Sequence, residues 1–126
     1  AWYYIELFTD PLDDNLLYVM SAPALRSIDG GKTWEDISST HGDYHDLWIN
    51  PKNPKNMIVA DDGGAAITFN RGQSWSSQYI YPTAQFYRIN VDNMFPYNIY
   101  AGQQDNTSVR IASREFGGGG ISTASW

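Results

Sequence analysis

The chain has 126 residues, with 8 Lys and Arg against 14 Asp and Glu, a net charge of −6 at pH 7 and an isoelectric point near 4.5. This acidic balance argues against a nucleic acid partner, and no apolar run approaches the roughly 20 residues of a membrane-spanning helix. The absence of cysteine excludes disulfides and thiolate sites, whereas 5 Trp, 9 Tyr and 5 Phe indicate a packed core.

Short apolar and aromatic runs recur along the chain between Gly, Pro, Asn and Asp clusters, and no stretch keeps a helical period, which predicts an all-β fold. The predicted strands form pairs around polar turns: 2–8 and 16–20 around 10–14, 46–49 and 57–60 around 50–54, and 86–91 and 99–102 around 92–96. Asn50 follows Asp10 by 40 positions, and Asp92 follows Asn50 by 42. Such a period, with four short strands per unit, is typical of a β-propeller blade.

A third run closes each of the first two units with a matching motif. Residues 27–34 read Ser-x-Asp-x-Gly-x-Thr-Trp, and residues 68–75 read Thr-x-Asn-x-Gly-x-Ser-Trp. We predict hairpins in which the carboxylate or amide accepts turn N–H bonds, the glycine adopts a positive φ and the tryptophan packs into the unit. These residues are expected to be structural: Ser27, Asp29, Gly31, Thr33, Trp34, Thr68, Asn70, Gly72, Ser74 and Trp75.

The full motif at 27–34, with its weaker copy one period later, resembles the Asp box of bacterial-neuraminidase-repeat propellers, a group that includes sialidases, glycoside hydrolases and the sortilin receptor domain. The stretches 41–51, 61–64, 85–87 and 103–106 look most like those of large sortilin-like or glycosyl-hydrolase-labelled bacterial repeat proteins. The resemblance implies blades of four antiparallel strands: blade 1 over 1–40, blade 2 over 41–82, and a partial blade 3 over 83–126 that contains a Gly-rich loop at 117–120.

About two full blades plus a partial third fall short of the four to eight blades of a closed propeller. We therefore expect the chain to be a fragment whose partners include the remaining blades of a longer protein. We expect that protein to be exported or displayed at the cell surface.

Loops at one end of the units carry much of the unusual polar and aromatic chemistry. In an up-and-down blade, the loops that enter the first strand and those that join the second and third strands share one end. The candidate ligand-binding residues in these loops are His41, Asp43, Tyr44, His45, Asp62, Tyr81, Gln103, Gln104, Asp105 and Asn106. Aromatic faces beside amides and carboxylates suit a polyol, so we predict a glycan or peptide ligand and no cofactor.

Two alternative functions stay open. A glycoside hydrolase needs one protonated and one ionised carboxyl group beside the bond, and the candidates are Asp43, Asp46 and Asp61, with a partner that could lie outside this chain. A purely structural propeller would only assemble other proteins. A metal site is not expected, because His41 and His45 in an extended segment lie about 13 Å apart.

Overall fold

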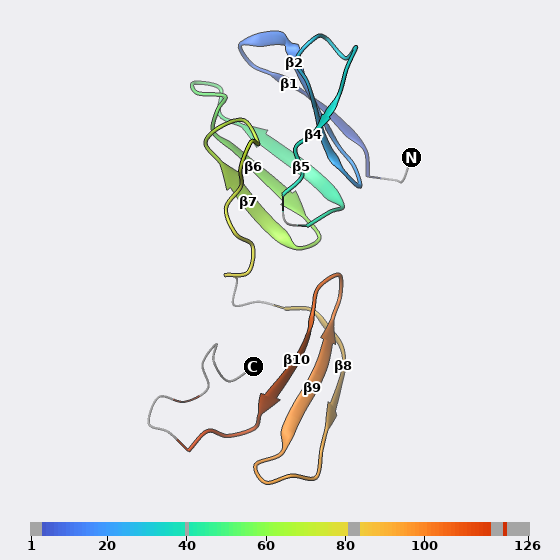
Figure 1. Ribbon diagram of the computed structural model, residues 1–126, viewed down its shortest axis with the longest axis vertical. Helices are drawn as coiled ribbons and strands as arrows, with labels where there is room; N and C mark the ends of the chain where they lie inside the picture. Colours follow the sequence, from blue (N-terminus) through green and yellow to red (C-terminus); the bar gives the residue numbers. More distant parts are fainter. Residues whose placement is uncertain (1–3, 40, 81–83, 117–119, 121–126) are drawn as a thin grey trace. The chain divides into compact units, whose positions relative to one another are not determined.

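A computed structural model describes residues 4–39, 41–80, 84–116 and 120 (Figure 1). These residues form β-strands, turns and bends, and no helix that could cross a membrane occurs among them. The chain divides into two compact units, Ala1–Tyr81 and Pro82–Trp126. Tyr81 and most of the Gly-rich loop predicted at 117–120 lie outside the described residues.

The first unit contains two antiparallel sheets. The first sheet has the order β1-β2-β3-β4, with β1 (Glu6–Asp10), β2 (Asp13–Met20), β3 (Ala24–Ser27) and β4 (Glu35–Asp36). The second has the order β5-β6-β7, with β5 (Tyr44–Ile49), β6 (Met57–Asp61) and β7 (Gly64–Thr68). Beyond β7, the Ser76 backbone N–H donates to the Ile67 carbonyl at 2.9 Å, so a single residue pairs where the first sheet has a fourth strand.

The second unit is one antiparallel sheet. Its order is β8-β9-β10, with β8 (Phe86–Val91), β9 (Asn98–Gln103) and β10 (Ser108–Ala112). The strand predicted over 86–91 is confirmed at both ends. The three sheets together confirm the all-β prediction with four strands in the first sheet and three in each of the others.

The turns between the first and second strands of the three sheets are built alike. In each, a side-chain oxygen of the first turn residue accepts the backbone N–H two residues later, which closes the turn. The pairs are Asp10 with Leu12 at 2.9 Å, Asn50 with Lys52 at 2.9 Å and Asp92 with Met94 at 3.1 Å. The sequence repeat therefore corresponds to the same hydrogen bond in all three turns. The first turn is shorter than predicted, because β2 already begins at Asp13.

The loop after β3 is held by a network centred on Asp29. The Ser27 hydroxyl donates to Asp29 Oδ1 at 2.8 Å and accepts the Gly31 N–H at 2.8 Å. Thr33 donates its N–H to Asp29 Oδ1 at 2.8 Å and its hydroxyl to Oδ2 at 2.6 Å. Gly31 has a φ of 89°, a conformation that a glycine adopts without strain. The motif therefore closes its own loop through side-chain hydrogen bonds.

The loop after β7 repeats the network with an amide in place of the carboxylate. The Thr68 hydroxyl donates to Asn70 Oδ1 at 2.8 Å and accepts the Gly72 N–H at 3.0 Å. Ser74 donates its N–H to Asn70 Oδ1 at 3.0 Å, while Asn70 Nδ2 donates to the Ser74 hydroxyl at 2.9 Å. The last bond runs in the opposite direction from its equivalent in the first loop, which is how the same geometry accepts either side chain.

The two tryptophans of the motifs differ in their surroundings. The Trp75 indole donates to the Ile37 carbonyl at 2.7 Å and packs against the core between the two sheets. Trp34 is 40% exposed, and its indole donates to the Gly31 carbonyl of its own loop at 3.1 Å. The packing prediction is confirmed for Trp75 and wrong for Trp34, because no preceding sheet covers Trp34 among the described residues.

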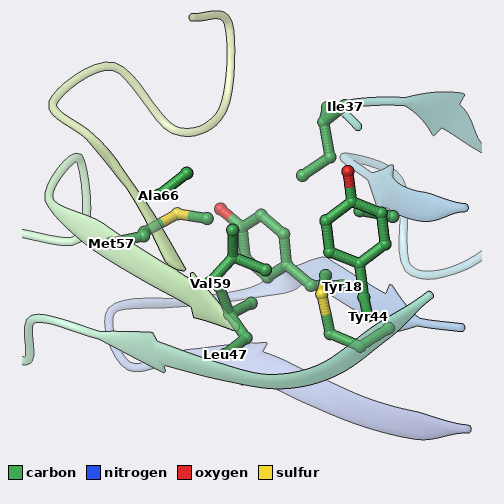
Figure 2. Close-up of a cluster of buried hydrophobic side chains, with 9 residues drawn as sticks. Tyr18, Ile37, Tyr44, Leu47, Met57, Val59 and Ala66 are labelled. Atoms are coloured by element: carbon green, nitrogen blue, oxygen red, sulfur yellow. The ribbon is translucent and has the colours of Figure 1, made fainter. Parts of the chain in front are cut away.

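The core of the first unit lies between its two sheets (Figure 2). Alternate residues of each strand point to one face, so fully buried side chains alternate with partly or fully exposed ones along β2 from Leu16 and along β6. Burying each large apolar side chain contributes about 1.5–3 kcal/mol, so this cluster fastens the two sheets together. Its members are Tyr18, Met20, Ala24, Ile37, Tyr44, Leu47, Met57, Val59 and Ala66.

An ion pair joins the two sheets at the end that carries the turns. The Asp10 side chain is 0% exposed, and its Oδ2 lies 3.5 Å from Nε of Arg71, in the loop after β7. Burial, and then the negative charge of Asp10, raise the pKa of the neighbouring Tyr18. Arg71 has a φ of 59°, and Arg26 donates to its carbonyl at 2.7 Å. This loop is therefore held onto the first sheet by its charge and by its backbone.

Several large apolar side chains remain exposed on the second sheet and in the second unit. On the second sheet they are Trp48, Ile58 and Ile67, at 53%, 40% and 42% exposure. In the second unit, Ile89, Val91 and Phe95 are exposed to between 55% and 87%. Contiguous apolar surface of this kind marks sites where another surface packs.

The Asp29 loop makes stability depend on pH. Hydrogen bonds from the Thr33 hydroxyl and N–H lower the pKa of Asp29 from 3.8 to about 2. A lowered pKa in the folded state means that the stabilisation is present above about pH 4 and is lost as the pH falls towards 2. We expect an NMR titration of the carboxyl carbon to give a midpoint near 2.

Asp29→Asn tests the same point, because Asn70 already forms the equivalent loop. We expect this variant to fold at neutral pH and to lose the part of the acid sensitivity that comes from Asp29. A midpoint near 4 for Asp29 would contradict the network.

Candidate functional site

The end of the first unit opposite the turns is formed by loops that hydrogen-bond to one another. Backbone N–H groups of Asp43 and Tyr44 donate to the carbonyls of Ala22 at 3.1 Å and Ser21 at 2.8 Å. Asp43 has a φ of 61°, in the left-handed region that Asp tolerates better than most residues. The loop that enters β5 is thereby fixed against the loop between β2 and β3.

Four side chains at this end form a connected polar group, which we call the His45 cluster: Tyr4, Asp43, His45 and Asp62. The Tyr4 hydroxyl donates to Asp43 Oδ1. The Tyr4 and His45 rings lie 4.9 Å apart between centroids and are tilted by 53°. His45 Nε2 lies 2.6 Å from Asp62 Oδ1, and these two side chains are 36% and 34% exposed. The cluster presents an aromatic ring, an imidazole and two carboxylates at a partly open surface.

A β-bulge directs His45 into this cluster. In the pairing of β5 with β6, Tyr44 faces Asp61 and Asp46 faces Ala60, so His45 is the extra residue between them. A bulge re-aims the extra side chain relative to the regular alternation of the strand, and bulges are common beside functional sites. Regular alternation was the only register signal in the sequence, so the bulge was not predicted.

Tyr44, predicted as a ligand-binding residue, does not present its ring at the surface of the site. Its side chain is fully buried. Its hydroxyl donates to the His41 carbonyl and accepts the Ser39 N–H. Tyr44 therefore stabilises the loop through its hydroxyl group. The alternation of β5 directs its ring into the core, while the bulge directs His45 outwards.

Asp61 has a structural position beside the site, where protein groups bond its carboxylate. It is 8% exposed, and both carboxylate oxygens lie 2.7 Å from Gln78 Nε2. It also accepts the Ser39 hydroxyl at 3.0 Å and the Gly63 N–H at 2.9 Å. Its oxygens are therefore engaged by protein donors. Among the three carboxylates suggested for catalysis, Asp43 lies in the His45 cluster, and exposed Asp46 accepts the N–H of Leu47 at 2.8 Å.

His41 lies against the backbone of the turn between β6 and β7. Its Nδ1 is 2.9 Å from the Gly42 carbonyl, and a Cβ on Gly63 would come within 2.6 Å of its ring. Only glycine therefore allows this approach. No group of three or more His, Asp or Glu side chains among the described residues is arranged to hold a metal ion.

Gly63→Ala is expected to destabilise the first unit by about 1–3 kcal/mol, since the new methyl group overlaps the His41 ring and forces it to move. Gly102→Ala is the matched control, because its Cβ would meet Ser108 Oγ at an ordinary 3.7 Å. The measurements are chemical denaturation and the ring-proton NMR shifts of His41. Unchanged His41 shifts in Gly63→Ala would show that the ring does not rest on this turn.

The remaining predicted site residues belong to the second unit. Gln103 to Asn106 form the turn between β9 and β10, where the Gln104 N–H donates to the Gln85 carbonyl at 2.9 Å and Asp105 has a φ of 57°. An open hollow of about 550 Å³ lies beside this turn, lined by Tyr87, Arg88, Gly102 and Gln103. Of the predicted set, Gln103 is the residue that lines it.

Comparison with known proteins identifies the architecture. No family model and no curated protein sequence matches the chain. Its structure is similar to the crystal structure of an ancestral GH74 enzyme, with a TM-score of 0.57 and 17% sequence identity over 81% of this chain. GH74 enzymes are β-propellers. This chain is built of β-propeller blades. It spans 14% of the length of that enzyme, and at this identity the likeness concerns the fold alone.

Proposed function

We propose that the chain is part of an Asp-box β-propeller and that its His45 cluster binds a glycan. The observation that carries this proposal is the connected group of Tyr4, Asp43, His45 and Asp62 at the loop end of the blades. Carboxylate oxygens accept hydrogen bonds from sugar hydroxyl groups, and an aromatic ring covers the apolar face of a sugar. Because the cluster holds two carboxylates and no Lys or Arg, it favours a neutral sugar over an acidic one.

Two observations support assignment to the Asp-box family. The loops after β3 and β7 use the same motif positions for the same hydrogen bonds, centred on Asp29 and Asn70. The GH74 enzyme supplies an independent link to propellers. The exposed apolar faces around Trp48 and Ile89 favour further blades as partners, and a polysaccharide ligand favours a protein that is exported or held at the cell surface.

Binding of the full-length protein to a glycan array, with a peptide array in parallel, tests this proposal. We expect Asp43→Asn and Asp62→Asn to weaken binding of a neutral oligosaccharide about tenfold, the usual effect of losing one charge-assisted hydrogen bond. Asp14→Asn, an exposed carboxylate in β2, is the matched control and should bind as the wild type does. Unchanged binding in both cluster variants, or binding to peptides alone, would overturn the proposal.

A second candidate function is glycoside hydrolysis, which the GH74 likeness favours. In this case Asp43 or Asp46 would act as acid or base with a partner carboxylate that could lie outside this chain. Release of reducing sugar by the full-length protein, abolished by Asp43→Asn or Asp46→Asn while binding persists, would support it. Binding without any release would leave the glycan-binding function.

A further inference from the structure

The β-bulge of β5 occurs again in the second unit at the equivalent position of the repeat. In the pairing of β8 with β9, Phe86 faces Gln103 and Arg88 faces Gly102, so Tyr87 is the extra residue. Tyr87 follows His45 by 42 positions, the same interval that separates the turns at Asn50 and Asp92. The device that directs His45 into its cluster therefore also directs Tyr87.

An open hollow lies at this second bulge, and we call it the Tyr87 hollow. Its lining residues are Tyr87, Arg88, Gly102 and Gln103, and its volume is about 550 Å³, within the range of sites for small ligands. Tyr87 is 69% exposed, so its ring is available to a ligand. Gly102 is exposed and has no side chain, which lets a ligand approach the strand backbone.

The charge of the Tyr87 hollow is opposite to that of the His45 cluster. Arg88 is exposed, and among the described residues of the second unit no side chain forms an ion pair or hydrogen bond with its guanidinium. A guanidinium matches the two oxygens of a carboxylate in one plane. The hollow thus combines an aromatic face, an amide and an exposed cation.

We propose that the Tyr87 hollow is a binding subsite for an acidic sugar, of the uronic acid class. Arg88 binds the sugar carboxylate, the Tyr87 ring covers the apolar face of the sugar, and the Gln103 amide bonds its hydroxyl groups. The inference rests on the proposed function only in that the ligand is a glycan. It adds a second subsite with the opposite preference for charge.

NMR titration of the chain with methyl β-glucuronide and methyl β-glucoside tests this subsite. We expect the glucuronide to shift the Tyr87, Gly102 and Gln103 signals with a dissociation constant on the order of 1 mM, as suits one sugar ring. The glucoside should bind there about tenfold more weakly. Arg88→Gln should remove the difference between the two sugars, whereas Arg114→Gln, an equal change of charge outside the hollow, should keep it.

Gly102→Val provides a steric test. A Cβ at this position would meet no atom closer than 3.7 Å, so the backbone accepts a side chain beside the hollow. We expect this variant to lose the glucuronide shifts at Tyr87. Equal affinity for the two sugars, or glucuronide binding unaffected by Arg88→Gln and Gly102→Val, would overturn the inference.

The same titration separates this inference from the proposed function. Signals of His45 and Asp62 report the cluster, and signals of Tyr87 and Gln103 report the hollow. A neutral oligosaccharide that shifts only the first pair supports the proposed function and overturns the acidic-sugar subsite. Glucuronide shifts at Tyr87 and Gln103, with no sugar response at His45 and Asp62, would support the acidic-sugar subsite and overturn the proposed function.

Discussion

Arg71→Gly is expected to destabilise the first unit by about 2–4 kcal/mol, although glycine suits the backbone at this position better than arginine does. Arg71 has a φ of 59°, and Gly30 occupies the equivalent place in the first loop with a φ of 71°. Relief of the left-handed backbone contributes about 1 kcal/mol in favour of glycine. Loss of the cation beside the fully buried Asp10 carboxylate costs about 3–5 kcal/mol and outweighs it.

Chemical denaturation followed by tryptophan fluorescence measures this effect, because Trp34, Trp48 and Trp75 all belong to the first unit. Adding Asp10→Asn to Arg71→Gly removes the unpaired charge, so the double variant should be more stable than Arg71→Gly alone. If Arg71→Gly is as stable as the wild type, the ion pair with Asp10 contributes no more than the left-handed backbone of Arg71 costs.

Tyr44→Phe is expected to destabilise the first unit by about 1–3 kcal/mol and to loosen the candidate site. Removing the hydroxyl leaves the partly buried Ser39 N–H and His41 carbonyl without this partner, and unmade hydrogen bonds of such groups have costs of this size. The loop that carries Asp43 then loses its hydrogen bonds to the Tyr44 hydroxyl. Because the effect passes through the loop, glycan binding should weaken together with stability.

Denaturation and amide hydrogen exchange over 39–45 measure the two parts of this expectation. Tyr79→Phe is the matched control, since Tyr79 is 77% exposed and such surface changes usually alter stability by less than about 0.5 kcal/mol. Unchanged hydrogen exchange in the loop of Tyr44→Phe would show that the Tyr44 hydroxyl does not support the site.

The sequence predicted the parts of the fold that depend on neighbouring residues. A backbone N–H two residues away is bonded by each of Asp10, Asn50 and Asp92, and Asp29 bonds groups within four residues. Because these contacts are local, their patterns can be recognised in one sequence. The period of these motifs then predicted the number and order of the sheets. Local hydrogen bonding and repetition were sufficient for the architecture.

The candidate site was only partly predictable, because its contacts join distant residues. The bond between Tyr4 and Asp43 spans 39 positions, and Tyr4 carried no motif that marked it. Tyr44 and His45 are adjacent, yet one is buried and the other reaches the surface, and this division depends on a bulge set by the pairing of β5 with β6. A polar or aromatic residue in a loop shows chemical capacity, whereas the direction of its side chain is decided by tertiary pairing.

The turns and loops of the sheets differ in how much sequence change they can accept. The Asp10, Asn50 and Asp92 turns and the Asp29 and Asn70 loops bond their own backbones, so their lengths are constrained. In the second unit, a backbone bond from the Gln103 N–H to the Thr107 carbonyl closes the loop between β9 and β10, and this loop connects strands whose register is already set. Loops grafted there would be presented by an unchanged frame, which makes these blades a scaffold for engineered recognition.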